Sequence, residues 1–484
     1  MSTAALKVVT GVPNASETDI RRVFKLQQEH AVKLRASSRA ERLEKIARLR
    51  DALLARRGEA RDAAYADFKK PEAEVDLTEI FPVLIEAKDA RKHLKKWMKP
   101  RKVRATLPMF GTKAQVRCEP KGVCLIISPW NYPVNLTFGP LVSALAAGNT
   151  AILKPSELTP HLSALMATLV RETFDEKEVA LFQGDQSVAT HLLKLPFDHM
   201  FFTGSPAVGK IVMAAAANHL SSVTLELGGK SPTIVDKTAN LKKAAANVVW
   251  GKFANNGQTC IAHDLLYVHQ DVRDAFVEEA RRRLAQVYGP DAQAQQQNPD
   301  YCRIVNPRHF QRLKQLLEDA TSKGAKVVAG GDTNAGDNFI APTLLENVPR
   351  DARVMQEEIF GPILPVIPFS ELDEVIDDIN SRPKPLALYV YGKDKARIEK
   401  VLRGTSSGGS CVNTSVVHFL HANLPFGGVN NSGIGNAHGE YGFKAFSHER
   451  AVLVDKFSTT SNLFPPYTKW VKAQINMIVG LFKR

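Results

Sequence analysis

The sequence contains no apolar run close to the roughly 20 residues that a membrane-spanning helix requires. Its N-terminal residues also lack the pattern of a cleavable signal peptide. The few cysteines are scattered, without a Cys-x-x-Cys pair or metal-ligand spacing: Cys118, Cys124, Cys260, Cys302 and Cys411. Free thiols of this kind are typical of a reducing compartment. We therefore expect a cytoplasmic protein without a metal site.

Aromatic residues make up only 7% of the chain, and no repeat of fixed period is present. Hydrophobic residues contribute 44% and charged residues 24%, a balance that is typical of a globular enzyme rather than a fibrous or disordered chain. A chain of 484 residues is too long for one ordinary core, so about two to four domains are expected. A cleft between domains is a natural place for a functional site.

The formal net charge of +14 is compatible with an anionic partner or with a solubilising surface. One basic cluster lies between Arg91 and Arg104. Zinc-finger spacing and aromatic RNA-binding motifs do not accompany it, so we expect no nucleic-acid partner. A basic protein that binds nucleic acid or membrane through this cluster remains the alternative to an enzyme.

The pattern of apolar residues changes along the chain. From Ser16 to about Arg104 the spacing of three and four predicts long, solvated amphipathic helices, the first of them starting at Ser16. Short β-rich runs then alternate with helical stretches, beginning with residues 122–128, 150–154 and 199–203. A second alternating block starts near Ser231. Such alternation predicts an α/β fold with parallel sheets covered on both faces.

Two side chains are candidates for catalysis. Cys260 ends the polar, glycine-containing segment Asn255-Asn-Gly-Gln-Thr-Cys260, which we interpret as a loop between a helix and a strand. A sulfur exposed to a cleft there could act as a nucleophile, although a small core residue is the ordinary reading of a cysteine. Glu226 lies in an apolar run before a glycine pair, so it is either a solvated strand end or a buried general base with a raised pKa.

Two further segments could bind a nucleotide. Phe202-Thr-Gly-Ser-Pro-Ala-Val-Gly209 follows a predicted strand and opens a helix, where backbone amides can meet a phosphate group. Lys154-Pro-Ser-Glu157 ends a strand of the same block, where parallel sheets place their ligands. Each segment alone is weak evidence, because glycine turns and charged turns are common in α/β proteins.

Taken together, the motifs resemble those of the aldehyde dehydrogenase superfamily. They occur in the family's order over residues 120–450 and comprise Pro129-Trp-Asn-Tyr-Pro133, Lys154-Pro-Ser-Glu157, Phe202-Thr-Gly-Ser205, Glu226-Leu-Gly-Gly-Lys230, Gly257-Gln-Thr-Cys260, Glu357-Glu-Ile-Phe-Gly-Pro362 and Pro425-Phe-Gly-Gly428. Within the superfamily the chain is most similar to the class 3 group, which acts on aliphatic, fatty and aromatic aldehydes.

The resemblance implies a Rossmann-like cofactor domain over residues 1–226, with a β-hairpin arm near 105–117. It further implies an α/β catalytic domain over 227–420 and a C-terminal oligomerisation segment over 421–460. A homodimer would be built partly from the segments flanking 105–117 and 440–455. Residues 461–484 are left as a basic, amphipathic tail, which suits a peripheral membrane contact or packing against a subunit equally well.

For the chemistry, the resemblance implies that Cys260 attacks the aldehyde and forms a hemithioacetal and then a thioester. The side-chain amide of Asn131 and the backbone N–H of Cys260 would stabilise the oxyanion. Glu226 would activate the water that hydrolyses the thioester. A cysteine-dependent hydrolase without a redox step would use the same three residues, but it would leave the nucleotide-binding motifs unexplained.

The same likeness assigns the cofactor site. Trp130 and Ser205 would lie near the pyrophosphate, with Gly204 and Gly209 allowing close approach. Lys154 and Glu157 would contact the adenosine ribose, and Glu358 would orient the nicotinamide ribose beside Phe360. A carboxylate such as that of Glu157 repels a 2′-phosphate, so we expect NAD as the cofactor, with NADP as a second choice.

Two positions depart from the class 3 pattern. This chain has Ala437 where class 3 members usually carry tyrosine, and His263 where they usually carry proline. We expect both residues to alter the entrance for the substrate, so the aldehyde cannot be copied from a class 3 relative.

Overall fold

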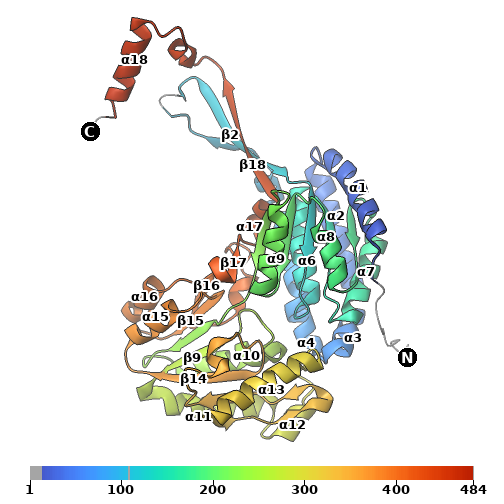
Figure 1. Ribbon diagram of the computed structural model, residues 1–484, viewed down its shortest axis with the longest axis vertical. Coiled ribbons are helices and arrows are strands. Elements are labelled where there is room, and N and C mark those ends of the chain that lie inside the picture. Colours follow the sequence, from blue (N-terminus) through green and yellow to red (C-terminus); the bar gives the residue numbers. More distant parts are fainter. Residues whose placement is uncertain (1–13, 107–108, 483–484) are drawn as a thin grey trace.

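The computed structural model describes residues 14–106 and 109–482, which form two α/β bodies and a projecting arm (Figure 1). Helical segments occupy the N-terminal part: α1 (Glu17–Leu34), α2 (Arg39–Ala55), α3 (Arg57–Phe68), α4 (Glu72–Val75), the π-helix η1 (Asp76–Ile80) and α5 (Phe81–Trp97). As predicted, α1 begins after Ser16, whose side chain accepts the backbone N–H of Asp19. The helical prediction is wrong beyond Trp97, because Arg101–Val103 forms strand β1.

The first body is built on a six-stranded sheet in the order β17-β7-β6-β3-β4-β5. Neighbouring strands are parallel except β17, which pairs antiparallel with β7. The strands are β3 (Val123–Ile127), β4 (Thr150–Lys154), β5 (Val179–Leu181), β6 (His199–Thr203), β7 (Ser222–Glu226) and β17 (Gly433–Ile434). The helices that connect them are α6 (Pro133–Ala147), α7 (Pro160–Thr173), α8 (Gln186–Leu193) and α9 (Pro206–Ala217).

Side chains of one strand enter two different cores, as the period of a β-strand requires. In β3, Cys124 and Ile126 pack in a core with α2, α3, α5, α6 and α7. Val123 and Leu125 point the other way, into a core with α1, α8 and α9. The sheet is therefore covered on both faces, which explains why its strands are continuously apolar rather than alternating.

The second body contains a seven-stranded sheet in the order β10-β13-β14-β9-β8-β15-β16, parallel except for the β10–β13 pair. Its strands are β8 (Pro232–Val235), β9 (Leu265–His269), β10 (Lys326–Ala329), β13 (Thr343–Glu346), β14 (Ile363–Phe369), β15 (Ala387–Tyr391) and β16 (Gly409–Val412). Its helices are α10 (Leu241–Phe253), α11 (Arg273–Tyr288), α12 (Ala292–Gln297), α13 (Pro307–Ser322), α14 (Arg353–Gln356), α15 (Leu372–Asn380) and α16 (Lys395–Gly404). A small ribbon pairs β11 (Thr333–Asn334) with β12 (Phe339–Ile340).

The arm is a three-stranded antiparallel sheet that extends away from the two bodies (Figure 1). Strand β2 (Thr112–Pro120) pairs with β1 on one side and with β18 (Ser447–Asp455) on the other. Strand β18 follows α17 (Gly439–Ala445), and helix α18 (Lys469–Gly480) lies at the far end of the arm. A strand from the C-terminal segment thus adds to the hairpin that we expected near 105–117. Among the described helices, none combines the length and apolar character needed to cross a bilayer.

Candidate active site

The carboxyl ends of the first sheet's strands collect the polar motifs at one edge. Strand β3 leads into Trp130 and Asn131, β6 leads into Gly204 and Ser205, and β7 ends at Glu226. Parallel strands present these ends on the same side, where open α/β sheets bind their ligands. The second body supplies residues 254–260, named the nucleophile loop after the role predicted for Cys260. This loop follows α10 and begins with the short helix η3 (Ala254–Gly257).

A cavity of about 240 Å³ lies where these segments meet. Eight of the residues selected from the sequence line it: Trp130, Asn131, Gly204, Ser205, Glu226, Cys260, Glu358 and Phe360. Leu136, Thr203, Leu227, His309 and Arg312 complete much of the wall. The structure therefore brings residues from both bodies to one space, as expected for a site in an interdomain cleft.

A second cavity of about 40 Å³ shares part of its wall with the first. Leu136, Thr203, Glu226 and Cys260 belong to both cavities. The remaining wall of the smaller one is mainly small or apolar, and includes Gly139, Pro140, Phe201, Phe426, Ala437 and Gly442. Cys260 and Glu226 thus belong to the walls of both the larger cavity and the narrow one.

The two residues that depart from the class 3 pattern lie in different surroundings. Ala437 lines the narrow cavity, as expected. His263 lines neither cavity in the described part of the chain, so the expectation that it shapes the substrate entrance is wrong. Its ring is fully buried, bonds the Thr233 hydroxyl and lies edge-on to Tyr389. A histidine beside the nucleophile loop fills the core there because the chain turns inward after Cys260.

Glu226 is buried in a way that favours the protonated carboxyl. Only 5% of the residue is exposed, and neither carboxylate oxygen has a hydrogen-bond partner among the described residues. Burial raises the pKa of Glu226 well above the ordinary value of a glutamate. The sequence allowed either a solvated strand end or a buried carboxyl group at Glu226. The structure shows a buried carboxyl group.

The Cys260 thiol is disfavoured as a thiolate in the ligand-free site. Burial, together with the negative charges of Glu358 and Glu226, raises the pKa of Cys260 to about 12. Backbone N–H groups of Cys260 and Ile261 act in the opposite direction, because they favour the anion. A nucleophile with these neighbours needs a base to accept its proton, and the carboxylate of Glu226 lines the same two cavities.

Glu358 is held from several sides. Burial and the charge of Asp264 raise the pKa of Glu358 to about 8. Its carboxylate lies against Gly228, where a Cβ atom would come within 2.4 Å of Oε1. The backbone beside it is fixed as well: Asp264 accepts the N–H of Ile359 at 2.8 Å, and Arg312 donates to the carbonyls of Glu358 and Ile359.

The larger cavity has features that fit a nicotinamide dinucleotide. Ser205 caps α9 by accepting the N–H of Val208, so the positive end of that helix faces the cavity. The Thr203 hydroxyl is buried without a hydrogen-bond partner among the described residues. Trp130 and Phe360 meet edge to face with ring centroids 5.4 Å apart, which provides an aromatic wall for a flat ring. Phe360 has a positive φ of 49°.

Three residues selected from the sequence do not line this cavity within the described chain. Lys154 and Glu157 pair with each other, with Nζ and Oε2 2.8 Å apart, at the carboxyl end of β4. Gly209 lies in α9 against Leu227, where a Cβ atom would approach the leucine Cδ2 to 2.7 Å. Lys154 and Glu157 are thus at the same sheet edge as the cavity, and Gly209 allows helix α9 to pack closely on the segment that follows Glu226.

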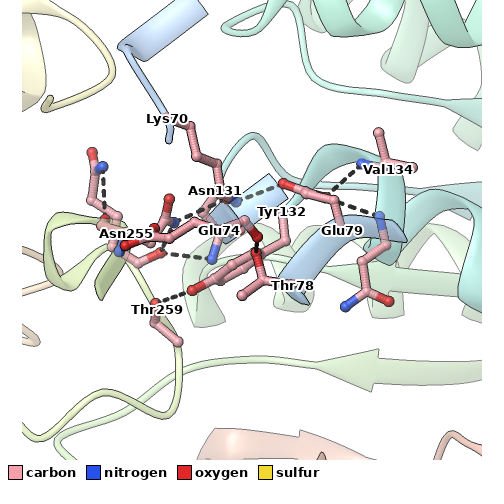
Figure 2. A network of polar contacts seen from close by, with 11 residues as sticks. Lys70, Glu74, Thr78, Glu79, Asn131, Tyr132, Val134, Asn255 and Thr259 are labelled. Atoms are coloured by element: carbon pink, nitrogen blue, oxygen red, sulfur yellow. Dashed lines mark hydrogen bonds and ion pairs between the residues drawn. The ribbon is translucent and has the colours of Figure 1, made fainter. Parts of the chain in front are cut away.

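Residues that sequence reasoning missed support Asn131 and the nucleophile loop. Lys70, Glu74 and Glu79 come from the N-terminal helical segment, which we expected to be solvated, and they join Tyr132 in a buried polar network (Figure 2). No local signal distinguishes these charges from those of a solvated helix, since distant segments bury them: η1 packs against α6, and Glu74 of α4 accepts the backbone N–H of Asn255. His309 and Arg312 were missed for the same reason: an amphipathic helix does not reveal which polar side chain faces a cleft.

Comparison with known proteins shows the family to which the chain belongs. The model of the aldehyde dehydrogenase family matches residues 1–452, and the chain belongs to that family. The rat protein named "Aldehyde dehydrogenase, dimeric NADP-preferring" is 45% identical over 81% of this chain and 85% of its own length. The mouse protein "Aldehyde dehydrogenase family 3 member A2" is 43% identical over 85% and 84%.

A solved structure supports the fold independently. The substrate-bound state of the Staphylococcus aureus enzyme AldH has a TM-score of 0.90 with 41% identity, covering 96% of this chain and 99% of that chain. The likeness to class 3 enzymes and the expected aldehyde dehydrogenase fold are therefore confirmed. The protein is an NAD(P)-dependent oxidoreductase that converts an aldehyde to a carboxylic acid. The hydrolase alternative is not favoured. The described residues contain no cluster of three or more His, Cys, Asp or Glu side chains that could hold a metal ion.

The raised pKa of Cys260 predicts how the ligand-free enzyme reacts with iodoacetamide. Because only the thiolate reacts, the alkylation rate should rise about tenfold for each pH unit across the neutral and mildly alkaline range, without a plateau. Mass spectrometry of the modified peptide measures the rate, and C260S supplies the background from the other cysteines. A plateau below about pH 9 would show that the thiol is already ionised there, contrary to the burial described above.

Proposed function

We propose that Cys260 is the nucleophile, Asn131 an oxyanion donor and Glu226 the general base of aldehyde oxidation. The observation that carries this assignment is the position of Cys260 and Glu226 in the wall shared by the two cavities. An aldehyde in the narrow cavity and a cofactor in the larger one would meet at the sulfur. The bond from Cys260 Sγ to the aldehyde carbon forms there, and the carbonyl oxygen gains a negative charge.

Asn131 and the Cys260 backbone N–H would stabilise that charge. In the ligand-free site Asn131 Nδ2 donates to the Gln258 carbonyl at 2.9 Å, beside the nucleophile. Preorganised donors in a site that excludes water are worth roughly 3–4 kcal/mol each in comparable oxyanion holes. The thiol proton passes to the Glu226 carboxylate, whose raised pKa makes it a suitable acceptor.

The cofactor, when bound, supplies the hydride acceptor that converts the hemithioacetal to a thioester. Trp130 and Ser205 would lie near its pyrophosphate, and Gly204 would allow its close approach. Gly209 would contribute by letting helix α9 pack closely on Leu227. Lys154 and Glu157 would contact the adenosine ribose, and Glu358 with Phe360 would hold the nicotinamide side. The Glu157 carboxylate disfavours a 2′-phosphate, while the Lys154 ammonium beside it lowers that repulsion. NAD is therefore the preferred cofactor and NADP a second one; a higher kcat/KM with NADP would contradict the preference.

Glu226 then acts a second time. Before this step the Glu226 carboxyl releases the thiol proton to solvent. The carboxylate then accepts a proton from water as the water oxygen attacks the thioester carbon. The carbon–sulfur bond breaks, the carboxylic acid leaves, and the Cys260 sulfur regains the proton from Glu226.

E226Q tests both proton transfers. Glutamine keeps the volume of the side chain but cannot accept a proton from the thiol or from water, so we expect a slower burst of reduced cofactor than in the wild type, followed by turnover that is slower by about 100-fold or more. Stopped-flow absorbance measures the burst, and mass spectrometry detects the acyl group retained on Cys260. E357Q is the control, because Glu357 is paired with Arg353 at the surface. Wild-type steady-state turnover in E226Q would remove Glu226 from the mechanism.

The substrate is a medium- or long-chain aliphatic or an aromatic aldehyde. The support is the wall of the narrow cavity, which includes Phe426 and Ala437 together with the small residues Gly139 and Gly442. Ala437 leaves the space that a tyrosine would fill.

A437Y tests whether this space admits large substrates. We expect kcat/KM for a long-chain or aromatic aldehyde to fall about tenfold to a hundredfold, because a few methylene groups lose their place in the pocket. The kcat/KM for propanal should fall much less, and the Kd for NAD should not change. Neither ligand is expected to depend on contact with residue 437. Equal losses for propanal and for the large aldehydes would contradict this role of Ala437.

A homodimer formed through the arm is the proposed assembly. The arm exposes apolar side chains that a monomer would leave in water: Phe110, Leu453, Val454 and Phe457 are 70%, 58%, 44% and 67% exposed. A sheet edge with such residues is a site for pairing with another chain. The printed name of the rat relative includes the word dimeric, which is in line with this proposal.

Helix α18 is the proposed membrane contact of a cytoplasmic enzyme. Trp470, Met477, Leu481 and Phe482 are between 58% and 78% exposed, at the end of the arm farthest from the two bodies (Figure 1). The helix has no acidic residue and carries Lys469 and Lys472, and Lys483 and Arg484 follow it in the sequence. Apolar side chains flanked by cations are what an interfacial helix needs on an anionic bilayer.

Deletion of residues 465–484 tests the membrane contact. The intact protein should sediment with vesicles that contain phosphatidylglycerol and much less with phosphatidylcholine alone, because the anionic lipid attracts the lysines. The deleted form should stay in the supernatant while its activity on propanal is unchanged. Light scattering of both forms shows whether the dimer persists without the tail. Unchanged sedimentation after the deletion would rule the contact out.

A further inference from the structure

A buried ion pair lies under the segment that carries Asn131. Lys70 Nζ and Glu79 Oε1 are 2.7 Å apart, and both side chains are 0% exposed. Lys70 follows the end of α3, and Glu79 lies in the π-helix η1. Figure 2 shows both side chains reaching the loop between β3 and α6. They are outside the two cavities described above and have no part in the proposed bond-making steps.

The carboxylate of this pair holds the start of helix α6. Glu79 Oε2 accepts the backbone N–H of Val134 at 3.0 Å and that of Asn135 at 3.1 Å. The N-cap residue Tyr132 provides no side-chain cap for α6. Glu79 therefore satisfies donors of the first turn that the helix itself leaves without a partner.

The ammonium of the pair holds the residues just before that turn. Lys70 Nζ lies 3.4 Å from the Asn131 carbonyl oxygen, to which it donates, and 4.1 Å from the centre of the Tyr132 ring. Cation–π contact and hydrogen bonding thus fix the same two residues. Together, Lys70 and Glu79 secure the segment 131–135 at both ends, and the side chain of Asn131 projects from its first residue.

The same segment is tied to the nucleophile loop. Asn131 Nδ2 donates to the Gln258 carbonyl at 2.9 Å, and Asn255 Nδ2 donates to the Asn131 carbonyl at 3.0 Å. The hydroxyls of Tyr132 and Thr259 share a hydrogen bond of 2.7 Å. The position of the Asn131 amide relative to Cys260 therefore depends on main-chain atoms that Lys70 and Glu79 hold in place.

Stability alone does not explain the pair. Removing two charges from water is expensive, and apolar side chains of similar volume often support a fold equally well. A buried pair has its clearest benefit where it specifies a geometry. The geometry specified here is that of a donor whose placement governs the rate, since a small displacement of a catalytic group has a large effect.

We propose that Lys70 and Glu79 are positioning residues that set the place of the Asn131 amide beside Cys260. The inference rests on the proposed role of Asn131 as an oxyanion donor. Lys70 and Glu79 act through the main chain of residues 131–135 and do not touch the aldehyde or the cofactor. Their loss should consequently change the rate of hydride transfer more than the binding of either ligand.

The test is the paired variant K70M/E79Q. Methionine and glutamine remove both charges with little change of volume, and glutamine keeps an acceptor for the N–H groups of α6. We expect a hydride-transfer rate about tenfold to a hundredfold below that of the wild type, measured from the burst of reduced cofactor. The KM for propanal, the Kd for NAD and the alkylation rate of Cys260 should stay within about twofold, because the sulfur and both cavities are retained.

Two further variants keep the test decisive. K69M is the matched control: Lys69 adjoins Lys70 but pairs with Asp337 at the surface, with Nζ and Oδ1 2.6 Å apart, and it should keep wild-type rates. If K70M/E79Q does not fold, as judged by circular dichroism and thermal unfolding, K70Q/E79Q removes the same charges with side chains of higher polarity. The same reduction of the hydride-transfer rate is expected in that variant.

A double-mutant cycle with N131A shows whether the pair acts through Asn131. N131A alone should slow hydride transfer by about 100-fold to 1000-fold. In the N131A background, adding K70M/E79Q should slow hydride transfer by less than about a further twofold, because the amide that Lys70 and Glu79 position is already missing. The same loss with and without Asn131, or a wild-type rate in K70M/E79Q, would overturn the inference. A wild-type rate in N131A would instead overturn the proposed role of Asn131.

Discussion

The active site depends on reciprocal hydrogen bonds between the loop after β3 and the nucleophile loop. The Asn131 amide donates to the Gln258 carbonyl, and the Asn255 amide donates to the Asn131 carbonyl. These bonds connect two α/β bodies that have separate cores, and an interface within a chain moves readily unless it is held. Asn131, the proposed oxyanion donor, and Cys260, the proposed nucleophile, come from different bodies, so the distance between them depends on these contacts.

The electrostatics of the site follow from this closure. Once the loops meet, Glu226 and Cys260 are withdrawn from water, and burial raises the pKa of each. Burying a carboxyl group and a thiol lowers the stability of the fold. Functional sites nevertheless contain such groups, because proton transfer needs side chains whose pKa is shifted. Lys70 and Glu79 are also buried, but each lies within hydrogen-bonding distance of the other.

Much of the fold was predictable because it depends on local patterns. The strands at 123–127, 150–154 and 199–203 follow from short β-rich runs, and Ser16 begins α1 as its hydrogen-bonding capacity predicts. The motif residues around Cys260, Glu226 and Glu358 were found from the family resemblance, and the structure brings these three side chains to one cavity. Their roles in the reaction stay predictions.

Other features depend on contacts between distant segments, which local patterns do not contain. His263 was expected in the substrate entrance, but it is buried against Thr233 and Tyr389, since the direction of the chain after Cys260 is decided by packing. The arm includes β18, more than 300 residues away from its partner β2. Lys70 and Glu79 were read as part of solvated helices.

The sequence by itself determined the family, the alternation of strands and helices and the chemical groups that the proposed reaction requires, because these are carried by residue identity and spacing. Only the tertiary structure decided which charges are buried, which side chains face the two cavities and how Asn131 is held beside Cys260. The physical reason is that burial and orientation are properties of the assembled core. Lys69 is paired at the surface and Lys70 is paired in the interior, although the two are neighbouring residues of the same type.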